Sequence, residues 1–166
     1  MSELFENLAE RIRGEVSDLE QVIERAGQAW QLVQTAQSKH YVYVDSVALN
    51  LHSFYSGLEK LFELIARHVD RNLPGGETWH RDLLLQMAQD FPSIRPAVIS
   101  PENATILDEF RRFRHLVRNV YTVNLLPEKM AGLMKSLPEL WLKLRAELLA
   151  FADYLEALNT SFQNSE

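Results

Sequence analysis

The sequence predicts an all-α fold, an up-and-down bundle of four to six helices, and three observations support this prediction. Apolar residues recur every three or four positions through most of the chain, which is the spacing of one helix face. Glycine and proline are scarce, with six of each among 166 residues, and they cluster between the periodic segments. No segment shows a convincing run of strand-like alternation. Residues 1–166 are therefore expected to form a single helical domain.

Two long helices are expected in the first half of the chain. The first carries one apolar stripe from Leu4 to Val33, and the second runs from about Lys39 to Arg71. The segment VYVDSV within the second is β-branched and aromatic, but it lies at the start of a strong helical pattern, so we assign it to the helix. The sequence NLPGG, residues 72–76, then ends this helix, because proline and glycine together stop helical propagation.

A short helix, a loop and a longer helix follow. Glu77–Asp90 has the pattern of a short helix, and DFPSIRPAVISP holds three prolines and predicts a loop. Ser100 and Pro101 indicate the next helix start, with serine as the N-cap and proline at the first position. We expect this helix to include FRRFRHLVRNVYTVNL, residues 110–125.

The last helical segment is interrupted by proline. Pro127 is expected to open a helix, and Pro138 either bends it or starts a new one. Leucines at helical spacing continue it to about Asn159, and the tail from residue 160 to residue 166 is expected to fray.

Composition limits the function classes. The formal net charge is -6 and the pI is near 5.4, so any contact with nucleic acid must come from a local basic patch. The absence of cysteine excludes disulfides, thiolate catalysis and cysteine-ligated metals. The charged first 20 residues do not have the pattern of a signal peptide, and no apolar run approaches the roughly 20 residues of a membrane span. We therefore expect a cytoplasmic protein with no membrane contact.

Residues 110–125 hold four arginines, a histidine, two asparagines and a tyrosine, but no acid. On a helix, residues three, four and seven positions apart share a face. Two neighbouring stripes result: Arg111, His115 and Arg118 form one, Arg114, Arg118 and Tyr121 form the other, and Asn119 borders both. Arginine binds phosphate oxygens and histidine moves protons near neutral pH, so this face suits RNA cleavage by the RNA's own 2′-hydroxyl. The alternative is a solvated helix face without function.

Three motifs together resemble the HEPN superfamily, and in particular its HepT-like members. The first motif is Leu51, His52, Phe54, Tyr55 and Glu59; the second is Pro74, Gly76, Trp79, His80, Leu83, Leu84 and Met87; the third is Phe113, Arg114, His115, Arg118, Asn119 and Tyr121. The resemblance spans about residues 44–124.

The resemblance implies an all-α homodimer with the two motif helices around a shared cleft. It implies a toxin that is a metal-independent endoribonuclease without a cofactor, paired with an MNT-type nucleotidyltransferase antitoxin that can adenylylate a tyrosine, here Tyr121. The implied catalytic residues are Arg118, His115, Arg114 and Asn119, and the implied RNA-binding residues are Arg111, Arg114 and Arg118.

The sequence departs from the HEPN pattern in one respect. That pattern is an arginine followed, after four to six residues, by a histidine. Here Val123 and Asn124 follow Arg118 at that distance, while His115 lies one helical turn before it. His115 can still reach the same face of the helix. The alternative is a non-catalytic nucleotide-binding or RNA-binding subunit of a nucleotidyltransferase complex.

Four further residues are candidates for supporting roles. His52, Tyr55 and Glu59 share a face of the second helix, where Glu59 could pair with the arginines and His52 could assist in the cleft. The alternative is a buried polar network that fixes helix register. His80 could contact RNA or a partner beside Trp79, which we expect to anchor the short helix. The histidines lack the spacing of a metal motif, so no metal site is predicted.

Overall fold

The structure, a computed structural model, describes residues 2–163. Over this range the chain forms five α-helices and one short 3₁₀ helix, and it contains no strand beyond an isolated bridge between Phe91 and Arg95. The elements are α1 (Ser2–Thr35), α2 (His40–His68), α3 (Trp79–Met87), α4 (Pro101–Asn119), η1 (Thr122–Asn124) and α5 (Glu128–Gln163). The predicted all-α fold is confirmed.

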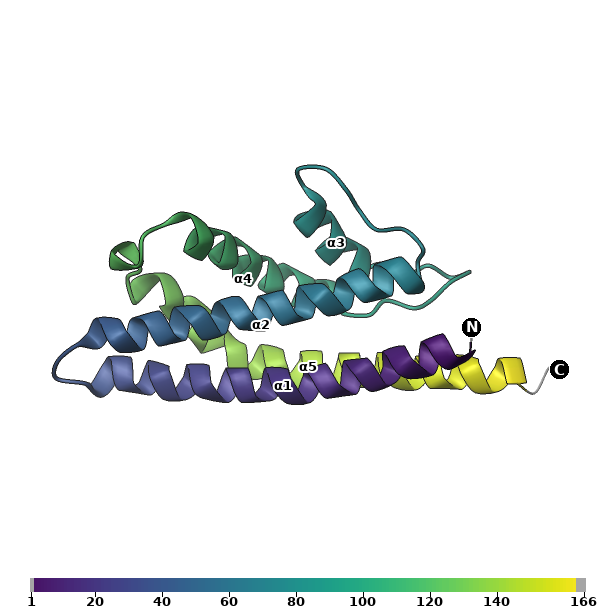
Figure 1. Ribbon diagram of the computed structural model, residues 1–166, viewed down its shortest axis with the longest axis horizontal. Helices are drawn as coiled ribbons and strands as arrows, with labels where there is room; N and C mark the ends of the chain where they lie inside the picture. The colour runs from purple at the N-terminus through teal and green to yellow at the C-terminus, as the bar shows by residue number, and fades with distance from the viewer. Residues whose placement is uncertain (1, 164–166) are drawn as a thin grey trace.

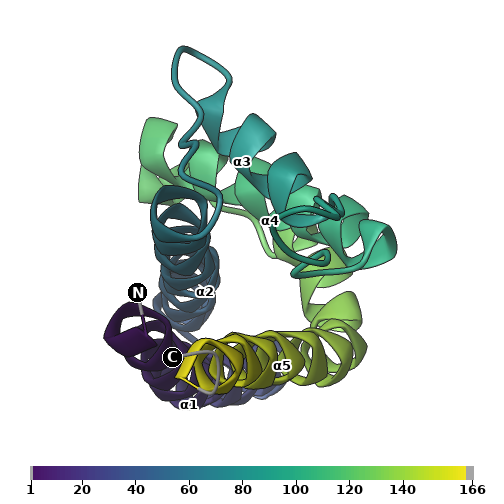
Figure 2. The same ribbon diagram turned by 90° about the vertical axis from the view of Figure 1, so that its right-hand side faces the viewer.

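The four longer helices alternate in direction, as an up-and-down bundle requires (Figure 1). Helix α1 packs along both α2 and α5, while α4 rests on α2 and α5 at the other side of the bundle. Helix α3 packs on α2 and α4. The end-on view shows α3 and α4 on the side of α2 that faces away from α1 (Figure 2). Among the described residues, no helix is long and apolar enough to cross a membrane.

The predicted apolar stripes meet in one continuous core. Side chains from different helices, such as Ile12, Leu51 and Leu144, are at most 1% exposed. The ring of Phe54 on α2 makes an edge-to-face contact with Phe110 of α4, with 5.4 Å between the ring centroids. Such a contact adds directional packing to the burial of apolar area. It holds the middle of α4 against α2.

The start of α4 is fixed as the sequence predicted. The Ser100 hydroxyl accepts a hydrogen bond from the backbone N–H of Asn103 at 3.2 Å, and Pro101 takes the first helical position. The carboxylate of Glu147 on α5 accepts two more hydrogen bonds, from the Ser100 N–H at 3.0 Å and the Asn103 side-chain amide at 2.8 Å. The N-terminus of α4 is thereby attached to α5.

The predicted end of α4 is wrong. The helix ends at Asn119, and Val120 is already extended, with φ −124° and ψ 153°. The residues that follow include β-branched valine and threonine, which are weak helix formers. The Asn119 side-chain amide also donates to the His115 carbonyl at 2.7 Å, a local side-chain bond of the kind that asparagine makes at helix ends. Tyr121 is therefore not on the helix.

The other boundaries lie close to their predictions. Helix α5 begins just after Pro127 and passes through Pro138 without ending. Proline removes one helical hydrogen bond and bends a helix; in Figure 1, α5 slopes away from the end of α4 before it turns parallel to α1. The helix continues past Asn159 to Gln163, and residues 164–166 of the predicted tail lie outside the described residues.

A buried ion pair holds the loops on either side of α3. Arg95 is 2% exposed, and its Nε and one terminal nitrogen donate to the two carboxylate oxygens of Asp70 at 2.5 and 2.7 Å. The remaining guanidinium N–H groups donate to the backbone carbonyls of Gln86, Gln89 and Pro96. Residues 90–101 were predicted to form a loop, but this ion pair was not predicted. It fixes α3 relative to the end of α2.

Candidate functional site

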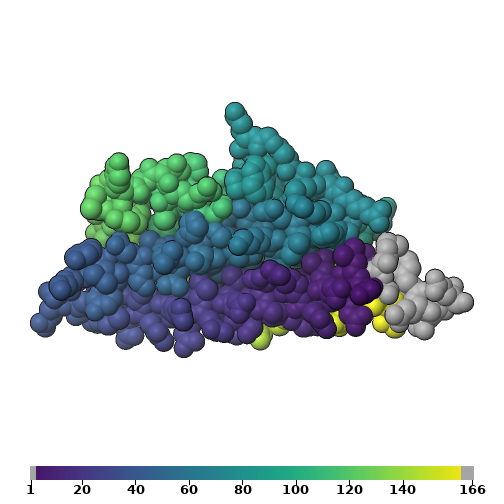
Figure 3. Space-filling model, in the orientation of Figure 1, coloured from purple at the N-terminus to yellow at the C-terminus, as the bar shows by residue number. Residues whose placement is uncertain are grey.

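A cleft of about 680 Å³ lies between the start of α3 and the outer face of α4. It is lined by Gly76, Glu77, Thr78, Trp79, His80, Arg81, Arg111, His115, Arg118 and Asn119. In the space-filling view, the teal atoms of the loop before α3 project from the surface, and a hollow separates them from the green atoms at the end of α4 (Figure 3). Two segments that are distant in sequence thus form facing walls.

The α4 wall contains the predicted stripe of Arg111, His115 and Arg118. Arg111 is partly neutralised, because its Nε donates to Asp108 at 2.7 Å. Arg118 is exposed and has no acidic partner among residues 2–163, so its guanidinium is available to an anion. Asn119 also lines the cleft, although its amide nitrogen donates to the carbonyl of His115. This wall combines a free cation with an exposed imidazole.

The α3 wall presents a second imidazole. Gly76 has φ 87°, a left-handed conformation that glycine adopts without strain, and this turn leads the chain into the start of α3. The rings of Trp79 and His80 stack, with centroids 3.7 Å apart. The first residues of α3 also bring the positive end of its helix dipole to this wall. Trp79 is half-buried against the core, as expected for an anchor.

Behind both walls lies a buried carboxylate, Glu59 of α2, which is 3% exposed. One of its oxygens lies 2.8 Å from Nδ1 of His80, and the other lies 3.1 Å from a terminal nitrogen of Arg114. The Arg114 Nε donates to the Ser56 hydroxyl at 2.9 Å. We call Glu59, Arg114 and His80 the Glu59 cluster. Glu59 thus pairs with one of the arginines of α4, Arg114, within a buried polar network.

Arg114 consequently does not lie where the predicted RNA-binding role requires. Its side chain is 15% exposed, and its guanidinium already binds Glu59 and Ser56. It is absent from the lining of the cleft, which its neighbours Arg111 and Arg118 reach. The helical stripe placed Arg114 and Arg118 on one face, but α2 covers the part of that face that Arg114 occupies. Arg114 is therefore placed to orient Glu59 and does not line the cleft.

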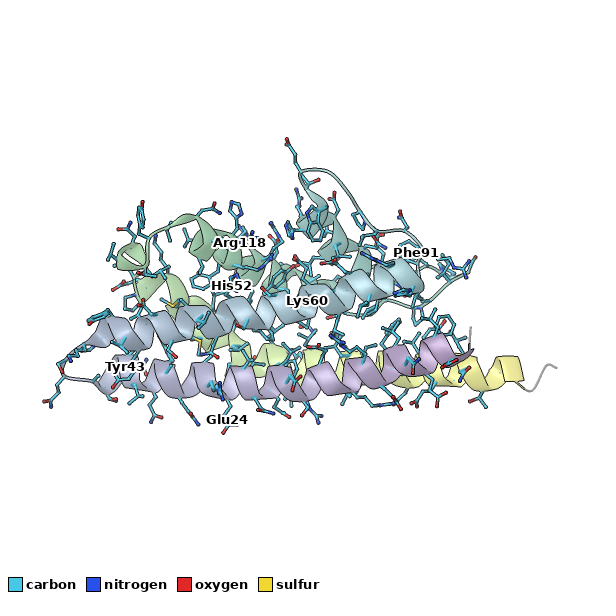
Figure 4. The ribbon with its side chains drawn as sticks, viewed as in Figure 1. Glu24, Tyr43, His52, Lys60, Phe91 and Arg118 are labelled. Atoms are coloured by element: carbon cyan, nitrogen blue, oxygen red, sulfur yellow. The ribbon has the colours of Figure 1, made fainter. Side chains whose placement is uncertain are left out.

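His52 and Tyr55 lie deeper than the cleft. Burial, followed by the positive charges of Arg114 and Arg118, lowers the pKa of His52 below its usual 6.5. Figure 4 shows His52 on α2 beneath Arg118 of α4. Tyr55 is fully buried, and burial together with the nearby Glu59 carboxylate raises the pKa of its phenol. Its hydroxyl has no hydrogen-bond partner within the described part of the chain.

Tyr121 lies apart from these groups. Its side chain is 82% exposed in the segment between α4 and α5, and Val123 beside it is 84% exposed. The predicted stripe of Arg114, Arg118 and Tyr121 is thus broken, because α4 ends before Tyr121. The side chain of Tyr121 is therefore accessible from solvent.

One cationic side chain of the cleft was not predicted from the sequence. Arg81 lines the cleft and is exposed, and it adds a cation to the α3 wall. The signal in the sequence was the position of Arg81, which directly follows His80 in the first turn of α3. A charged side chain at this exposed helix end lies close to His80. In the described residues, no group of three histidine or acidic side chains is placed to hold a metal ion.

The family of the chain follows from a comparison with family models. Residues 46–155, about two-thirds of the chain, match the model described as HepT-like protein. The chain belongs to the HepT-like family. This range contains all three motifs on which the resemblance rested, and it contains both walls of the cleft and the Glu59 cluster. No match was found among curated proteins or among solved structures.

Proposed function

We propose that this HepT-like protein is a toxin that cleaves RNA without a metal ion in the cleft between α3 and α4. The observation that carries the proposal is the meeting of Arg118, which has no acidic partner among residues 2–163, with His115 in one concave surface. Arg118, assisted by Arg111 and Arg81, binds the phosphate and stabilises charge that builds on its oxygens. His115 moves a proton, and Asn119 fixes the last turn of α4 on which His115 lies.

The test is cleavage of RNA by the purified protein in EDTA. We expect products with 2′,3′-cyclic phosphate ends, and a loss of about 100-fold or more in Arg118→Ala and in His115→Ala. Arg112→Ala is the matched control, because Arg112 lies on the same helix but pairs with Asp108 outside the cleft. A wild type that leaves RNA intact when Tyr121 is unmodified would refute the nuclease function.

The second candidate function is a non-catalytic subunit that presents the cleft to a nucleotide or to RNA. The observation that favours it is the absence of a histidine after Arg118, where the exposed Val123 stands instead. This function requires binding without cleavage. Tight RNA binding that depends on Arg118, together with intact RNA after long incubation, would support it and exclude the nuclease.

The proposed partner is an MNT-type nucleotidyltransferase antitoxin that modifies Tyr121. The exposure of the Tyr121 side chain supports this assignment, since a transferase must reach its hydroxyl. Mass spectrometry after co-expression with an MNT-type nucleotidyltransferase should show the mass of added AMP groups. Tyr121→Phe should abolish the addition, and Tyr41→Phe, which removes another exposed tyrosine, should not. A homodimer is also proposed, and sedimentation of the purified protein tests it.

A further inference from the structure

His80 is held from the protein side and open on the cleft side. Its Nδ1 lies 2.8 Å from the buried Glu59 carboxylate, and its ring stacks on Trp79 at an interplanar angle of 29°. The hydrogen bond and the stack together fix both the rotation and the plane of the ring. The side chain is nevertheless 30% exposed and lines the cleft. Because Nδ1 is occupied by Glu59, Nε2 is the nitrogen that remains for a ligand.

Glu59 is itself held in place, which stabilises its hydrogen bond to His80. Its side chain is 4% exposed, and Arg114 binds its second oxygen at 3.1 Å. A carboxylate with both oxygens bound is fixed in rotation. A buried carboxylate behind an imidazole selects one tautomer and stabilises the charge of a doubly protonated ring. The Glu59 cluster therefore has the form of a proton-transfer group with its orienting carboxylate.

RNA cleavage by the 2′-hydroxyl needs two proton transfers, one to a base and one from an acid. His115 supplies one of them in the proposed function. Val123 stands where the HEPN pattern has its histidine. Apart from His115, His80 is the one other histidine among the residues that line the cleft. It faces His115 from the opposite wall.

We propose that His80 is the second proton-transfer residue of this cleft, with Glu59 as its positioning residue; this inference rests on the proposed ribonuclease function. His115 takes the proton of the 2′-hydroxyl, and O2′ forms a bond to phosphorus. The bond from phosphorus to O5′ breaks, and His80 gives the proton on Nε2 to that oxygen. The products are a 2′,3′-cyclic phosphate and a 5′-hydroxyl end. Proton exchange with water then restores the two rings: His115 loses the proton that it took, and His80 regains the proton that it gave.

The experiment compares His80→Asn with the wild type on two substrates. The asparagine amide takes the position of Nδ1 and retains the hydrogen bond to Glu59, but it offers no group in place of Nε2. One substrate is a short RNA with a single cleavable phosphodiester, and the other has sulfur in place of O5′. A thiolate leaves without a proton, so it needs no acid. We expect His80→Asn to lose about 100-fold on the ordinary RNA and to approach wild type on the sulfur substrate.

Two controls define the outcome. His115→Ala should be slow on both substrates, because the 2′-hydroxyl must still lose its proton. Thermal unfolding should show that His80→Asn is folded. The inference is overturned if His80→Asn cleaves ordinary RNA at the wild-type rate, or if it is equally slow on both substrates. A wild type that cleaves neither substrate overturns the proposed function itself, and the inference with it, so the two failures are distinguishable.

Discussion

Two arginine–carboxylate pairs lie on either side of α3, and they differ in how completely their polar groups are satisfied. Arg95 and Asp70 have side chains that are 0% and 3% exposed, and each N–H direction of the guanidinium meets a carboxylate or carbonyl oxygen. The Glu59–Arg114 pair instead continues into His80, whose ring reaches the cleft. A closed pair of this kind, in which every polar group is bonded, fixes structure, whereas a pair that ends in an accessible imidazole can orient that imidazole for proton transfer.

The largest effect on stability is expected from removing one partner of the closed pair, Arg95 and Asp70. Arg95→Ala leaves the Asp70 carboxylate buried without a counter-charge, which costs about 3–5 kcal/mol of the free energy of unfolding. Urea denaturation measures this loss. Arg112→Ala removes an exposed arginine from a surface pair and should cost about 1 kcal/mol or less. Equal losses in the two variants would show that the Arg95 pair is not a structural constraint.

A matched pair of amide substitutions separates the two roles. Glu59→Gln keeps the shape of the side chain but removes the charge that orients His80, so we expect RNA cleavage to fall about tenfold or more. Asp70→Asn makes the same chemical change in the closed pair. It should lower the melting temperature while the cleavage rate per folded molecule stays near wild type. Both rates are measured at a temperature at which each variant is folded. The distinction fails if Asp70→Asn reduces cleavage as strongly as Glu59→Gln.

The same contrast explains how much the sequence could predict. Ser100 and Pro101 act locally, so the start of α4 followed from their chemistry, and the apolar stripes followed from helical period. The choice of Arg114 as the partner of Glu59 did not follow, because Arg114 and Arg118 share a stripe. Only the way α2 packs against α4 decides which of them is covered.

The missed features depend on contacts between distant segments. The Asp70–Arg95 pair joins the end of α2 to a loop 25 residues later, and no local period marks such a pair. A single charged residue, the arginine, inside the otherwise uncharged PSIRPAVIS was the available signal. The end of α4 was misplaced because the helical pattern outweighed the weak helix propensity of the residues after Asn119. Tyr121 left the predicted stripe for that reason.

A smaller effect is expected at Tyr55, whose buried hydroxyl lies close to the Glu59 cluster and has no partner among residues 2–163. A buried polar group without a hydrogen bond costs free energy, so removing it restores part of that cost. Tyr55→Phe should raise the free energy of unfolding by about 1 kcal/mol. Urea denaturation tests this, and Tyr41→Phe at an exposed position is the control. A destabilised Tyr55→Phe would mean that the hydroxyl is bonded in solution.

The smallest effect is a dependence of stability on pH. It involves both Arg114, which lies behind the cleft, and Arg118, which lines it. Burial and the charges of Arg114 and Arg118 hold the pKa of His52 below 6.5, so near that pH His52 binds more proton in the unfolded chain than in the folded chain. The free energy of unfolding should therefore fall as the pH is lowered from 7 through 6.5.

Thermal unfolding between pH 7 and pH 5.5 measures this slope. His52→Gln should reduce it, and His68→Gln on the same helix should leave it in place. Arg118→Ala should reduce the slope only in part, because Arg118 acts on His52 less than burial and Arg114 do. If Arg118→Ala leaves the slope unchanged, solvent screens the charge of Arg118. The exposed cation of the cleft then has no effect on the pKa of His52.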